Sequence, residues 1–131
     1  MAEVLLFHHA LGLTAGCRSF GDELRAAGHT VHTPDLYEGR TFTDLTQGAG
    51  HAQEVGFDKI LERGQQAADG LPSEIVYAGF SLGVLPTQML AQTRPGARGA
   101  VLVSSAVPTS EFGGTCPDGF LRLPSRAIID A

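Results

Sequence analysis

Ser81 lies at the centre of the pentapeptide GFSLG at 79–83, a G-x-S-x-G pattern. A serine hydroxyl becomes a useful nucleophile when it projects from a tight strand-to-helix turn, between a base and backbone N–H donors. The apolar run at 75–78 precedes the pattern and a segment with helical spacing follows it, so the context predicts such a turn. The alternative is an ordinary glycine-rich turn in which Ser81 only caps the helix.

Predicted strands and helices alternate along the chain on both sides of this turn. Apolar runs predict strands at 4–7, 30–33, 74–78 and 100–103. Helical spacing predicts helices at 18–27, 54–68 and 82–93. Such alternation is typical of α/β architecture, a three-layer sandwich with a mostly parallel sheet.

The connections follow from the same pattern. We expect the strands in the order second, first, third, fourth, with a fifth strand at 127–129 beside the fourth. Residues 35–51 are polar and rich in glycine, and we expect them to form a long loop over the sheet edge.

Composition sets limits on the protein class. A chain of 131 residues, 43% of them hydrophobic, predicts one globular domain spanning 1–131. The net charge is -5 and the only lysine is Lys59, so we expect neither nucleic acid nor an anionic membrane as a partner. The N-terminus has no basic region ahead of its apolar run, which predicts a cytoplasmic protein without a signal peptide.

The cysteines and glycines predict no bound metal or cofactor. Cys17 and Cys116 are far apart and form no C-x-x-C pair, which indicates neither a disulfide framework nor a zinc site. The first turn lacks G-x-G-x-x-G and Walker A patterns, so a nucleotide-binding domain is disfavoured. Cys17 lies near the start of a predicted helix, where its pKa could be lowered, but we interpret it as a packing residue.

Three motifs in order carry a resemblance to a known family. The segments FHHALGLTAG, TPDLYEG and AGFSLG resemble the dienelactone hydrolase family of α/β-hydrolases over roughly residues 4–119. The resemblance implies hydrolysis of a small ester or lactone through an acyl-enzyme, with Ser81 as the nucleophile. It also implies an oxyanion hole built from the N–H groups of Ala10 and Leu82. The best-known members carry cysteine at the position of Ser81.

The resemblance leaves the general base unassigned. In this fold the triad runs Ser, then Asp or Glu, then His, yet all five histidines precede Ser81, at positions 8, 9, 29, 32 and 51. We therefore expect a truncated α/β-hydrolase fold that lacks the C-terminal part carrying the catalytic Asp and His. His9 is the candidate substitute base, with a loop-positioning role as its alternative. His8 and His9 point to opposite faces of a strand and cannot chelate a metal together.

Two further expectations concern binding. Arg40 is a candidate for holding a substrate carboxylate, in line with the family's acidic lactones, and its alternative is a solvated loop arginine. The fourth strand, 100–103, is expected to leave an exposed sheet edge through which copies of the chain associate. The sequence thus leaves two functions open: a serine hydrolase, or a catalytically inactive fragment or module that binds a small acid or a partner.

Overall fold

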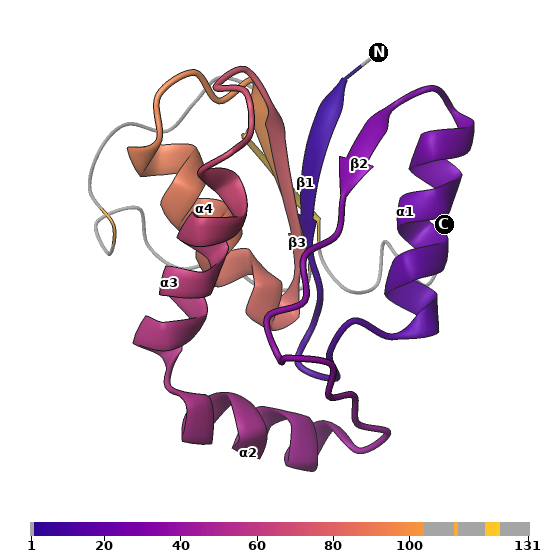
Figure 1. Ribbon diagram of the computed structural model, residues 1–131, viewed down its shortest axis with the longest axis vertical. Helices are drawn as coiled ribbons and strands as arrows, with labels where there is room; N and C mark the ends of the chain where they lie inside the picture. Colours follow the sequence, from indigo (N-terminus) through magenta and orange to yellow (C-terminus); the bar gives the residue numbers. More distant parts are fainter. Residues whose placement is uncertain (1, 104–111, 113–119, 124–131) are drawn as a thin grey trace.

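The computed structural model describes residues 2–103, 112 and 120–123 and contains a five-stranded sheet (Figure 1). Its strands, all parallel to their neighbours, are listed in chain order: β1 (Glu3–Phe7), β2 (Thr30–His32), β3 (Val76–Phe80), β4 (Gly99–Val103) and β5 (Phe120–Leu123). The spatial order is β2-β1-β3-β4-β5, so the predicted order of the first four strands is confirmed.

Helices cover both faces of the sheet, as the three-layer prediction requires. Helix α1 (Ala15–Ala26) lies on one face, and α3 (Phe57–Ala68) and α4 (Val84–Thr93) lie on the other (Figure 1). Side chains of β1 alternate between the two cores, as expected for a strand with a period of two residues. Leu5 and Phe7 join the core under α3 and α4, whereas Val4 and Leu6 join the core on the opposite face.

The order in which strands are added to the sheet reverses between β1 and β3. The chain leaves β1, crosses through α1 to β2 at the edge, and later returns to place β3 on the other side of β1. Parallel sheets form their binding sites where the carboxyl ends of two such strands diverge. The loop after β1 and the turn after β3 therefore share one end of the sheet.

One helix was missed by the sequence-based prediction. Residues 35–51 were expected to form a loop, but α2 (Leu45–Val55) occupies most of the second half of that range. The Asp44 side chain caps the helix by accepting the Thr46 N–H at 2.9 Å. The helix expected at 54–68 begins only at Phe57, because Gly56 has φ 94° and separates α2 from α3.

The prediction that β4 forms an exposed sheet edge is wrong. Strand β5 pairs with β4 in register from Ala100–Phe120 to Val103–Leu123, so the backbone of β4 has a neighbour on both sides. The fifth strand expected at 127–129 lies outside the described residues. Self-association through a sheet edge stays a prediction without support from β4.

None of the helices in residues 2–103 has the length and hydropathy needed to cross a bilayer.

Two glycines allow α4 to begin directly against the sheet. A Cβ atom on Gly83 would lie 2.5 Å from the His8 carbonyl oxygen and 2.6 Å from that of Phe7. A Cβ atom on Gly79 would collide with the Gly83 carbonyl oxygen and the Thr87 hydroxyl, which are themselves hydrogen-bonded at 2.8 Å. At Gly83 the turn from β3 into α4 therefore lies directly against the backbone at the end of β1.

We predict that Gly83→Ala lowers the free energy of unfolding by at least about 2 kcal/mol, because the atoms that a methyl group meets are backbone atoms at the end of β1. The measurement is urea denaturation. Gly50→Ala in α2 is the matched control, since nothing lies within 4 Å of its Cβ position. That change should leave stability unaltered or raise it by up to about 1 kcal/mol. Equal effects of the two substitutions would contradict the packing account.

Candidate active site

Ser81 occupies a strained turn between strand and helix. It begins the short 3-10 helix η1 (Ser81–Gly83), which joins β3 to α4, and its φ is 51°. A non-glycine residue in this left-handed region is uncommon and costs of order 1–2 kcal/mol. Such strain is typical of a nucleophile elbow, which holds the serine out at the carboxyl end of its strand. In the described part of the chain the Ser81 hydroxyl has no hydrogen-bond partner.

Ala10 lies in the turn that follows β1. The Gly12 N–H donates to the His9 carbonyl at 3.0 Å, and the Leu11 N–H donates to the His9 Nδ1 at 3.2 Å. The Ala10 N–H has no acceptor among the described residues. Leu82 is in the first turn of η1, where leading N–H groups have no partner within a helix. Both backbone donors expected from the sequence are thus available to an anionic oxygen.

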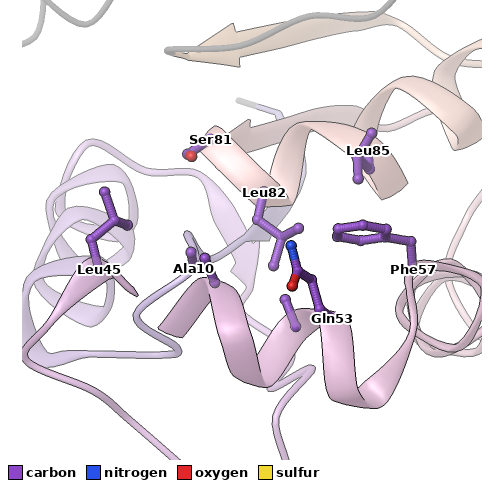
Figure 2. Close-up of a pocket in the computed structure, with 9 residues that line it drawn as sticks. Ala10, Leu45, Gln53, Phe57, Ser81, Leu82 and Leu85 are labelled. Atoms are coloured by element: carbon purple, nitrogen blue, oxygen red, sulfur yellow. The ribbon is translucent and has the colours of Figure 1, made fainter. Parts of the chain in front are cut away.

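The structure brings Ser81, Ala10 and Leu82 together in the lining of one pocket of about 380 Å³. Its other described lining residues come from α2, α3 and α4: Leu45, Ala49, Ala52, Gln53, Phe57 and Leu85. Figure 2 shows Ser81 and Leu45 toward one end, Phe57 and Leu85 toward the other, and Gln53 between them. A nucleophile and two donors at one end of a concave apolar space make this pocket the candidate active site.

Most of the pocket wall was not anticipated from the sequence. Helix α2 lies across the carboxyl ends of the central strands (Figure 1) and supplies four of the lining residues. It approaches so closely that a Cβ atom on Gly48 would collide with the Ala10 carbonyl oxygen. The signal present in the sequence was Asp44, a favoured N-cap residue, followed by the small residues Gly48 and Ala52 at helical spacing.

His8 is a buried structural residue. Its Nε2 accepts the Leu36 N–H at 2.9 Å and its Nδ1 lies 2.7 Å from the His9 carbonyl, so Nδ1 carries the proton. Burial lowers the pKa of His8, although the His9 carbonyl and Asp35 act in the opposite direction. The neutral ring therefore ties β1 to the segment after β2.

His9 and Cys17 are coupled electrostatically. The Cys17 side chain raises the pKa of His9 above its ordinary value of 6.5, although partial burial opposes it. Burial would raise the pKa of the Cys17 thiol, but the interaction with His9 outweighs it and the pKa is lowered. Cys17 is 4% exposed in the first turn of α1, where the Thr14 side chain caps its N–H at 3.5 Å. The packing interpretation of Cys17 is thus incomplete.

These contacts bear on the two roles considered for His9. The His9 ring accepts the Leu11 N–H at Nδ1, so it holds the turn after β1, and it is coupled electrostatically to Cys17 at the start of α1. His9 is absent from the described lining of the Ser81 pocket. Both observations favour the positioning role over that of a base.

The structure does not bring Arg40 to the Ser81 pocket. Its guanidinium lies 5.1 Å from the centroid of the Phe42 ring, in a cation–π arrangement. Arg40 and Phe42 line a separate, more polar hollow together with Gln47, Gly50, His51 and Glu54. No group of three metal-ligating side chains lies close together within the described residues.

We predict that Cys17→Ala lowers the pKa of His9, because the thiol is the main cause of its elevation and burial then dominates. The measurement is a titration of the histidine ring protons by NMR. A His9 pKa that is unchanged in the variant would rule out the pairing.

Comparisons with known proteins give a match in structure alone. No family model matches the sequence, and no curated protein matches it. The protein named m3DLH superposes with a TM-score of 0.60 at 16% identity, over 81% of this chain and 48% of that protein. A crystal structure named for a dienelactone hydrolase from Klebsiella pneumoniae gives a TM-score of 0.60 at 20% identity, over 84% of this chain and 52% of that one.

The chain spans about half the length of these solved structures. Identities this low carry the fold and nothing finer. With its sheet order and its helices on both faces, the chain has the fold of dienelactone hydrolases, a partial α/β-hydrolase fold.

Proposed function

We propose that this chain carries the nucleophile and oxyanion half of a serine hydrolase of the dienelactone hydrolase type, acting on a small ester or lactone. The observation that carries the proposal is the joint placement of Ser81, at φ 51°, with Ala10 and Leu82 in one pocket. No metal or cofactor is invoked. The cytoplasmic location rests on the sequence alone.

In the proposed reaction the Ser81 Oγ attacks the substrate carbonyl carbon and its proton passes to a base. The carbonyl oxygen becomes an oxyanion, which accepts hydrogen bonds from the Ala10 and Leu82 N–H groups. Losing one such donor typically costs about 3 kcal/mol of transition-state stabilisation. Collapse of the intermediate expels the alcohol and leaves an acyl-enzyme, which water cleaves in a second round of the same chemistry.

The proton acceptor is the missing part of this scheme. The Nδ1 of His9 accepts the Leu11 N–H, and His9 is absent from the described lining of the Ser81 pocket, which disfavours it as the acceptor of the Ser81 proton. The sequence contains no histidine after Ser81, where the triad order of this fold would place one. We therefore propose that the isolated chain binds and orients a substrate but turns it over slowly.

A second candidate function is a binding module without turnover. The observation that favours it is that His9, the candidate base, is absent from the described lining of the Ser81 pocket. In that case the pocket would hold its ligand through shape and apolar contact, and the strained turn would have no catalytic use. Reactivity of Ser81 distinguishes the two functions.

We predict that a fluorophosphonate labels Ser81 about 10²- to 10³-fold faster than it labels the exposed Ser73, because the two N–H donors stabilise the charged intermediate at phosphorus. The rates are read by mass spectrometry of peptides, with Ser81→Ala as the control for site assignment. Equal labelling of the two serines would favour the binding module.

We predict near-background hydrolysis of p-nitrophenyl acetate by the purified 131-residue chain and by its Ser81→Ala and His9→Ala variants. Triad members act as a unit, and loss of the histidine alone removes on the order of 10⁶ in rate from a comparable protease. Robust turnover that disappears in both variants would contradict this prediction and make His9 the general base.

A further inference from the structure

The described lining of the Ser81 pocket is apolar except at two positions. Seven of its nine residues are Ala, Leu or Phe, and the remaining two are Ser81 and Gln53. No charged side chain is found in that lining. A carboxylate placed here would lose part of its hydration without gaining an opposite charge, which is unfavourable.

The exposed apolar side chains point to the same conclusion. Three large apolar side chains in the described residues are exposed: Phe20 at 39%, Leu45 at 62% and Phe57 at 46%. Two of the three, Leu45 and Phe57, line this pocket from α2 and α3. Phe20 lies elsewhere, with its ring edge-on to Phe80 at 5.1 Å. Apolar surface left open at a pocket is typical of a site that binds an apolar ligand.

The arrangement gives the ligand a direction. Ser81 lies toward one end of the pocket, and Phe57 and Leu85 lie toward the other (Figure 2). A carbonyl carbon at Ser81 would therefore place the rest of its acyl group along Leu82 and toward Phe57. Arg40, which the sequence analysis offered as the residue that holds a substrate carboxylate, lines a different hollow.

We propose that the pocket takes an uncharged acyl group with an alkyl tail, in preference to the carboxylate-bearing acyl group of an acidic lactone. The proposal deepens the proposed function and rests on it for the chemistry at Ser81. Recognition of the tail depends only on the pocket, so it can be tested without turnover.

The test uses amides, which resemble the ester but are not cleaved on the timescale of the experiment. Binding of acetamide, butanamide and hexanamide to the 131-residue chain is followed by NMR shifts of backbone N–H groups in α2, η1 and α4. We expect binding to tighten about fourfold for each methylene buried. Adipamate, in which a carboxylate replaces the terminal methyl of hexanamide, should bind at least about tenfold more weakly.

Variants separate this pocket from its alternatives. Phe57→Arg should reverse the preference and favour adipamate, because it adds a cation at the end where the tail lies. Phe20→Arg is the matched control, an exposed phenylalanine outside the pocket, and should change neither affinity. Arg40→Leu should also change neither.

Several outcomes would overturn the proposal. Adipamate binding as tightly as hexanamide would do so, as would loss of adipamate binding in Arg40→Leu. Shifts confined to residues outside the pocket, or no hexanamide binding, would mean that the exposed leucine and phenylalanine serve another purpose. If the fluorophosphonate does not label Ser81 but hexanamide still binds, the proposed function is defeated and this inference stands.

Discussion

The contact between the start of α4 and the end of β1 is the constraint on which the site depends. Because Gly83 has no side chain, the helix begins within van der Waals reach of the Phe7 and His8 carbonyls. That contact places the turn bearing Ser81 beside the turn bearing Ala10, although the two residues are 71 positions apart in the sequence. The strained φ of Ser81 persists because the packing on both sides of it leaves no room for relaxation.

The core of the fold was predictable because it depends on local apolar patterns. Each buried strand is a short apolar run, and the alternation with helices fixes a parallel sheet with few allowed topologies. The elbow was predictable for a related reason, since Gly79 and Gly83 are required by contacts within and next to the turn itself. The order β2-β1-β3-β4 then placed Ala10 and Ser81 at the same end of the sheet.

Local patterns could not predict the pocket wall, strand β5 or the coupling between His9 and Cys17. Gly48 and Gly50 lower the helix propensity of α2, and Gly48 is needed only because the helix meets Ala10 in three dimensions. Strand β5 lies in a segment whose pattern gave no strand, and it forms by pairing with β4. The electrostatic coupling between His9 and Cys17 links a turn to a helix, and no spacing rule connects those two residues. Tertiary contact decided all three features.

The approach of α2 to the turn after β1 has an evolutionary consequence. Gly48 lies against the backbone of Ala10, which lines the pocket, and the same helix supplies Leu45 and Ala52 to the wall. A substitution that moves α2 outward to widen the pocket also releases the turn that holds Ala10. The width of the pocket and the position of Ala10 are therefore inherited together. A lineage with this fold would change the shape of the pocket more readily through residues on α3 and α4 than through α2.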